Sequence, residues 1–197
     1  QRLADHYKAL HHAAESRRDT DVAAEHEVLL RIHDQAEQHA QYLRGVGTFS
    51  LTTDPPGATV MLRPMVTQDR REVPGKAKRL GKTPLQEVEL AMGSYLLEVQ
   101  EEGRHPVDYP IFIRREEHWD GVRPGAEVPT PIHLPGLDEV PPDACLVPPG
   151  WTWVGGDSSA LNSPFEGQWV WVDGFWAHRF PVSIPAYMRF LDAQVEA

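Results

Sequence analysis

Near the middle of the chain the sequence reads Asp54-Pro55-Pro56-Gly57-Ala58-Thr59-Val60-Met61-Leu62, a turn signal followed at once by an apolar run. Proline fixes the backbone angle φ and Gly57 accepts positive φ, so the first four residues predict a tight turn. Val60 and Leu62 alternate with other residues, which is typical of a strand with one buried face. The segment therefore predicts β-structure at the centre of the chain.

Further short apolar runs lie on both sides of this segment, at residues 49–51, 96–99 and 111–113. Residues 91–94 and 102–104, which contain Gly93 and Gly103, predict two more turns at the spacing of β-hairpins. We therefore expect residues 46–134 to form an antiparallel β-sandwich.

Residues 1–45 contain no proline, and their only glycine is the last residue, which favours helix. Apolar or mid-sized side chains recur at helical spacing in two stripes, separated by a polar break at 16–20. The stripes are Leu3, Tyr7, Leu10, Ala14 and then Val22, Leu29, His33, Ala36, Ala40, Leu43. Asp19 or Thr20 can cap the second helix, and Gly45 can end it. We expect a helical hairpin or a short coiled-coil arm, and hence an α+β chain.

Most of the histidines fall in this arm: His6, His11, His12, His26, His33 and His39. His33 and Glu37 have the spacing of metal ligands on a helix. The histidines nevertheless scatter around the helix axis, so we interpret them as residues of a solvated face. No metal site is predicted.

Residues 116–120, Glu-Glu-His-Trp-Asp, carry the groups of a general acid–base site. They directly follow an expected strand and precede Gly121. We interpret them as an exposed loop anchored by a buried Trp119. Trp119 is a candidate interaction residue, and no catalytic residue is predicted.

The composition excludes some functional classes. A net charge of −10 argues against nucleic-acid binding, and the apolar runs are far shorter than a membrane span. The one cysteine, Cys145, cannot form an intrachain disulfide, which suits a cytoplasmic protein.

One basic cluster stands out in the acidic chain, between residues 63 and 82. Its members Arg70, Arg71, Lys76, Lys78 and Arg79 are candidate interaction residues. They can dock an acidic partner, such as the acidic C-terminal stretch of this chain. Alternatively, they belong to a solvated hairpin loop whose charges protect a sheet edge.

Three motifs in the expected sandwich resemble the PEGA domain, a small bacterial module. They are residues 56–60, Pro-Gly-Ala-Thr-Val, 81–85, Gly-Lys-Thr-Pro-Leu, and 92–99, Met-Gly-Ser-Tyr-Leu-Leu-Glu-Val. Pro56 replaces the usual glutamate, and residues 63–79 form a longer insertion. The resemblance implies a binding or spacing role, because the family is not known for chemistry.

A proline-rich connection at 135–146 is expected to act as a semi-rigid linker. Beyond it, residues 147–157 and 171–176 resemble the opening of the formylglycine-generating enzyme (sulfatase-modifying factor) family, whose fold is related to C-type lectins. In this reading residues 147–197 are the N-terminal part of such a domain. Trp171 and Trp176 pack a sheet and are candidate interaction residues. The family's reactive cysteine pair is absent, so we expect no oxidation of cysteine and no cofactor.

The order of these parts, with the strings at 118–121 and 93–97, resembles the middle of a bacterial serine/threonine protein kinase family. No kinase catalytic motif is present in the chain. We predict a non-catalytic interaction and spacer segment of a larger signalling protein, whose partner is another protein or the remainder of the parent chain. Two alternatives stay open: the regulatory part of a formylglycine-type oxidoreductase, and a fragment released by a regulatory protease.

Overall fold

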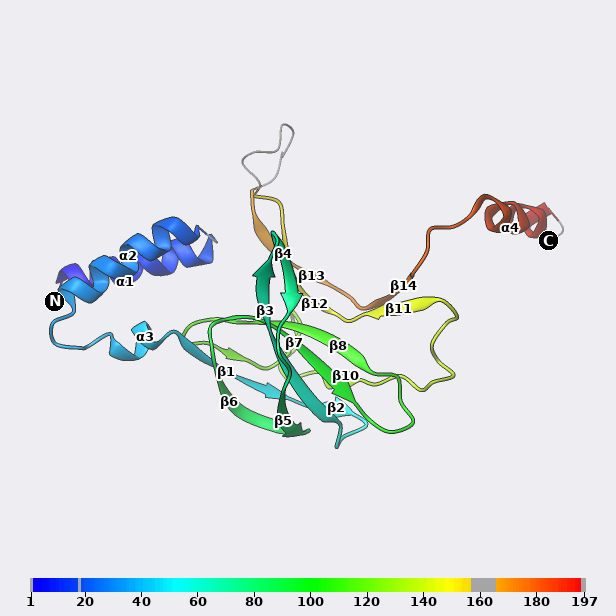
Figure 1. Cartoon of the computed structure of the whole chain (residues 1–197), viewed down its shortest axis with the longest axis horizontal. Coiled ribbons are helices and arrows are strands. Elements are labelled where there is room, and N and C mark those ends of the chain that lie inside the picture. The colour runs from blue at the N-terminus through cyan, green and yellow to red at the C-terminus, as the bar shows by residue number, and fades with distance from the viewer. Residues whose placement is uncertain (1, 18, 157–165, 196–197) are drawn as a thin grey trace.

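The computed structural model describes residues 2–17, 19–156 and 166–195 and shows a mixed α+β chain. Arg18, Asp157 and the other residues of 157–165 and 196–197, which belong to the predicted break and C-terminal domain, lie outside the described residues. The N-terminal helices, the central sheets and the C-terminal helix follow one another along the longest axis (Figure 1).

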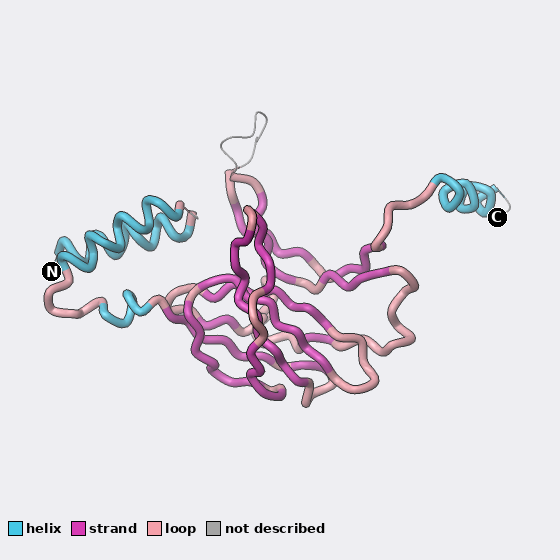
Figure 2. The backbone as a smooth tube through the Cα atoms, in the orientation of Figure 1, coloured by secondary structure: helices cyan, strands magenta, loops and turns pink. Residues whose placement is uncertain are grey.

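The arm consists of α1 (Arg2–Ser16), α2 (Thr20–His33) and α3 (Ala40–Arg44). Helices α1 and α2 pack side by side as the predicted hairpin (Figure 2). Asp19 caps α2 through the backbone N–H of Val22 at 3.3 Å, and Gly45 ends α3 in the left-handed conformation. Leu30 and Tyr42 form the small buried core of the arm with Ala4.

The predicted second helix is shorter than its apolar stripe. It ends at His33, and the prediction of a continuous helix toward Leu43 is wrong. The carboxylate of Asp34 accepts hydrogen bonds from the backbone N–H groups of Gln38 and His39, at 2.9 and 2.8 Å. These bonds compete with helix continuation and form a turn before α3.

Two sheets form the centre of the molecule. One has the order β6-β1-β9, and the other the order β4-β3-β7-β8 with β5 also paired to β3. Their bounds are β1 Val46–Leu51, β3 Thr59–Gln68, β4 Arg71–Pro74, β5 Lys78–Lys82, β6 Leu85–Ala91, β7 Gly93–Gln100, β8 Val107–Ile113 and β9 His118–Trp119.

Side chains from both sheets share one buried core, as expected of two packed layers. It contains Phe49 of β1, Val60 of β3, Leu97 of β7 and Ile111 of β8, among others. All four predicted strand runs lie in observed strands. Two pairings within residues 46–134 are parallel rather than antiparallel: β9 runs alongside β1, and β10 (Ile132–His133) alongside β2 (Thr53–Asp54).

The two predicted hairpin turns differ in outcome. The turn containing Gly103 joins β7 to β8, which pair as an antiparallel hairpin. The turn containing Gly93 joins β6 to β7, which belong to different sheets. The prediction of a hairpin there is wrong, because the chain crosses from one layer to the other at that point.

The insertion at 63–79 is paired backbone rather than an open loop. Burial alternates along β3 as far as Leu62 and then ceases. The outer half of β3 pairs with β4 through a turn at Asp69 and Arg70, both with positive φ. This β3–β4 hairpin projects beyond the core (Figure 1).

The remaining elements are β2 (Thr53–Asp54), β10 (Ile132–His133), β11 (Ala144–Val147), β12 (Gly150–Val154), β13 (Gln168–Val172), β14 (Phe175–His178) and α4 (Ile184–Val195). Strand β2 pairs with β10, β11 with β14, and β12 with β13. Strand β11 begins inside the range predicted as a linker, at Ala144.

Helix α4 lies away from the sheets at the end of an extended connection (Figure 1). Its surroundings are open: Phe180 is 70% exposed and Ile184 80% exposed. No helix of the described ranges is both long and apolar enough to cross a membrane.

Candidate functional site

The arm and the sheets meet at one buried cation. Arg115 lies two residues beyond the end of β8 and is only 8% exposed. Its guanidinium donates to the Glu15 carboxylate of α1 at 3.0 Å, to the Glu27 carboxylate of α2 at 3.3 Å and to the Tyr42 carbonyl of α3 at 2.6 Å. One side chain therefore bonds all three helices. We call Arg115, Glu15, Glu27, Tyr42 and His11 the joint.

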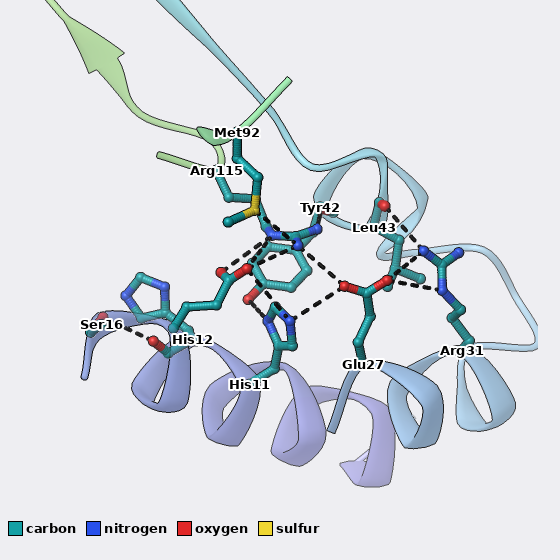
Figure 3. Close-up of polar contacts among 10 residues, drawn as sticks. His11, His12, Ser16, Glu27, Arg31, Tyr42, Leu43, Met92 and Arg115 are labelled. Carbon is teal, nitrogen blue, oxygen red and sulfur yellow. Dashed lines mark hydrogen bonds and ion pairs between the residues drawn. The ribbon is translucent and has the colours of Figure 1, made fainter. Parts of the chain in front are cut away.

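His11 closes the joint from within the arm (Figure 3). Its Nδ1 lies 2.6 Å from the Tyr42 hydroxyl, and its Nε2 lies 3.6 Å from Glu15 and 3.5 Å from Glu27. The residue is 1% exposed, so its assignment to a solvated helix face is wrong. The guanidinium of Arg115 also stacks over the Tyr42 ring, 4.8 Å from its centre.

Burial and neighbouring charges shift the pKa values of His11, Glu27 and Tyr42 in the joint. Burial lowers the pKa of His11, and the positive charge of Arg115 adds to that effect, against the opposing carboxylates. Burial alone would raise the pKa of Glu27, but the hydrogen bond from Arg31 and the charge of Arg115 outweigh it and lower the pKa. Burial, with Glu15 nearby, raises the pKa of Tyr42 to about 12. Tyr42 therefore keeps its proton, and His11 favours the neutral form.

A second feature is a cavity of about 320 Å³ between β8, β9 and the β12–β13 hairpin. We call it the aromatic cleft. Its lining residues include Tyr109, Phe112, Arg114, Glu117, His118, Trp119, Asp120, Trp151, Trp169 and Trp171. A cavity of this size accommodates a small ligand or a few side chains of a partner.

Several contacts hold the rings of the aromatic cleft in place. Trp119 meets Tyr109 edge to face, with ring centres 5.8 Å apart. Trp171 donates its indole N–H to Asp173 at 3.0 Å and meets Trp151 at 5.7 Å. The rings are therefore fixed by packing before any ligand arrives.

The structure brings some of the predicted interaction residues together and separates others. Trp119 and Trp171, far apart in sequence, both line the aromatic cleft. Trp119 lies in the short strand β9 rather than in a loop, because its backbone pairs with β1. Trp176 lies on β14, where it meets His105 with ring centres 6.4 Å apart.

The predicted basic residues form a separate surface. Arg70, Arg71, Lys76, Lys78 and Arg79 are all exposed on the β3–β4 turn, β4, β5 and their connection. Within the described residues, none of them makes an ion pair. A contact with the acidic C-terminal stretch is thus not formed in the described part of the chain.

Sequence reasoning missed the joint and half of the cleft. Arg115 and Glu15 are separated by 100 positions, so no local pattern connects them. Trp151 and Trp169 were part of, or next to, the strand motifs quoted for the C-terminal region. The alternation of tryptophans in 151–153 and 169–171 was the available signal, since it places Trp151 opposite Trp171 once the two strands pair.

Two polar side chains of residues 116–120 already have hydrogen-bond partners within the protein. His118 Nδ1 lies 2.7 Å from the Thr48 hydroxyl, and Asp120 accepts from the backbone N–H of Val122 at 3.0 Å. Among residues 2–17, 19–156 and 166–195, no three His, Cys, Asp or Glu side chains converge in a way that could hold a metal ion.

Comparison with known proteins gives no further assignment. No family model matches the chain, and neither curated proteins nor solved structures include a match. The resemblances to PEGA domains, to formylglycine-generating enzymes and to a kinase family therefore stay predictions from sequence.

Proposed function

We propose that this chain is a non-catalytic interaction and spacer segment of a larger signalling protein. The observation that carries the proposal is the joint. Arg115 bonds α1, α2 and α3 to the end of β8, and a buried hydrogen-bonded cation has few alternative geometries. Such a connection fixes the direction of the arm relative to the sheets, which is what a spacer requires.

In this proposal the parent is a cytoplasmic bacterial serine/threonine protein kinase. Residues 46–134 act as a PEGA-like sandwich, and 147–197 begin a formylglycine-enzyme-like domain. The motifs quoted above support the assignment, as does the Trp-rich antiparallel pairing of β12 with β13. The free thiol of Cys145 fits a reducing compartment.

In this proposal two exposed surfaces contact partners, one apolar and one basic. Apolar side chains of the C-terminal part, including Trp176, Phe180 and Tyr187, are exposed and would pack against a protein partner or the remainder of the parent chain. The basic residues of the β3–β4–β5 region offer unpaired positive charge to an acidic partner.

Distance measurement between two spin labels tests the spacer role. In a Cys145→Ser background, labels at Ala24 on α2 and Glu102 in the β7–β8 turn occupy exposed sites on the two sides of the joint. Double electron–electron resonance should give one narrow distance distribution. A pair at Ala24 and Arg2, both within the arm, provides the reference width. A far broader Ala24–Glu102 distribution would rule out a rigid spacer.

A further inference from the structure

The aromatic cleft plays no part in the joint, and its composition is distinctive. Four of the six tryptophans of the chain line it: Trp119, Trp151, Trp169 and Trp171. An indole face attracts cations through its electric quadrupole, more strongly than the ring of Tyr or Phe. We propose that the cleft binds a small organic monocation with an apolar surface, of the methylated ammonium class.

The charges of the lining favour this class. Among the carboxylate, ammonium and guanidinium groups, the lining carries two carboxylates, Glu117 and Asp120, and one guanidinium, Arg114, which leaves one negative charge. Arg114 already lies 3.5 Å from Glu117 and 4.9 Å from the centre of the Trp169 ring. A monocation would therefore neutralise the lining, whereas an anion would add to its negative charge.

Asp120 is the carboxylate available to the ligand. Its Oδ1 accepts from the backbone N–H of Val122, and it contacts no cation among the described residues. Trp119 and Asp120 both line the cleft, which therefore offers an indole ring and a carboxylate together. A methylated ammonium group requires both, an aromatic surface for its methyl groups and a nearby negative charge.

The site is also preorganised. Trp119 is held by Tyr109, and Gly121 lies close under its ring, where an added Cβ would approach within 3.4 Å. Trp171 is fixed by its hydrogen bond to Asp173. Rings that are already ordered lose little conformational entropy on binding, which favours capture of a small ligand.

An added peptide strand is the main competing occupant, because β8 is an edge strand that borders the cleft. Pro110 lies in the middle of β8, opposite Leu96 of β7. Proline has no backbone N–H for an added strand and disfavours strand pairing at an edge. Recognition through side chains is therefore favoured over extension of the sheet.

The test is a titration of the whole chain, followed by tryptophan fluorescence, with choline and with 3,3-dimethylbutan-1-ol. The two have the same shape, but the alcohol lacks the charge. Choline should saturate the signal at about 1 mM or below, and the alcohol should bind about tenfold more weakly or worse. Asp120→Asn should raise the half-saturating choline concentration about tenfold. Trp176→Phe, outside the cleft, should leave it unchanged.

Two outcomes of this titration would overturn the proposal. Equal binding of the alcohol and choline would make the cleft a plain apolar cavity and overturn the proposal, as would the absence of saturation by choline. Folding of Asp120→Asn is checked by its unfolding midpoint, and choline against its uncharged analogue remains decisive without any variant. Co-sedimentation with phosphatidylcholine vesicles alongside choline binding would name a lipid headgroup as the source of the cation. Choline binding in the cleft does not depend on the spacer role.

Discussion

Replacement of Arg115 by alanine is expected to release the arm from the sheets while both parts stay folded. The arm keeps its own small core, and the two sheets keep theirs. Arg115 belongs to neither core, since its side chain contacts Glu15, Glu27 and Tyr42 from the end of β8. The variant therefore acts on the contact between the parts.

The size of the effect follows from burial. The Arg115 side chain is 6% exposed, and the carboxylates of Glu15 and Glu27 are 17% and 28% exposed. Removing one member of a buried ion pair typically costs about 3–5 kcal/mol, because the partner charges stay buried without compensation. The carboxylates are partly exposed, and Glu27 keeps its ion pair with Arg31 at 2.6 Å. Both facts place the expected loss at the lower end, about 3 kcal/mol. The equilibrium for opening of the arm should then shift by roughly two orders of magnitude.

Hydrogen exchange of the backbone amides measures this opening. Protection in α1 and α2 should fall by about a hundredfold in Arg115→Ala, whereas amides of β3 and β7 should stay protected. Arg44→Ala is the matched control. Arg44 also links the arm to the sheets, through Glu89 at 2.9 Å, but both side chains are more than half exposed. Its removal should cost no more than about 1 kcal/mol.

Two results would refute the reasoning about Arg115. If the two variants lose protection in α1 and α2 equally, burial of the cation is not what holds the arm. If Arg115→Ala instead lowers the protection of β3 and β7 as much as that of the arm, the joint is part of one cooperative core. The arm would then not open separately, and the spacer would be a single folded unit.

The joint should weaken in acid. The pKa of His11 is lowered from its ordinary value of 6.5 by burial, so its contribution is complete above pH 6.5 and is lost as the pH falls through the lowered value. The protection factors of α1 and α2, which correct for the intrinsic pH dependence of exchange, should therefore fall as the pH drops below 6.5. His11→Gln should flatten that dependence, and equal pH profiles of the two proteins would contradict this. Gly47→Ala should be strongly destabilising, because its Cβ would lie 2.2 Å from the Arg114 carbonyl oxygen. The Cβ of Gly57→Ala would meet no atom within 4 Å, so this variant should lose only the strain of its positive φ, about 1–2 kcal/mol. Chemical denaturation measures the unfolding free energy of both variants, and similar losses would contradict the packing argument.

Local sequence signals predicted elements better than connections. The runs containing Phe49, Val60, Leu97 and Ile111 are strands because one face of each joins the core. The turn at Gly93 was wrongly predicted to join two paired strands, and its sequence could not have shown otherwise. Turn residues show that the chain changes direction, but they do not show which strand receives the hydrogen bonds.

In the candidate site, too, single residues could be predicted but their tertiary contacts could not. Trp119 and Trp171 were selected as aromatic side chains with an interaction role, and the fold places both in one cleft. The role of Arg115 could not be predicted, because its partner carboxylates lie 100 and 88 positions away in the sequence. Pairing between charges at such separations depends on the tertiary fold, and no periodicity along the chain records it.

The polar bonds of the joint are complete without a charge on His11. Tyr42 keeps its proton and can donate to Nδ1, which leaves the Nε2–H of a neutral imidazole facing Glu15 and Glu27. Arg115 supplies positive charge to both carboxylates, and Arg31 supplies more to Glu27. A buried ion pair adds little net stability compared with apolar packing, but it tolerates fewer geometries. The joint is therefore better suited to fixing the direction of the arm than to strengthening its attachment, and this is the property that the proposed spacer role requires.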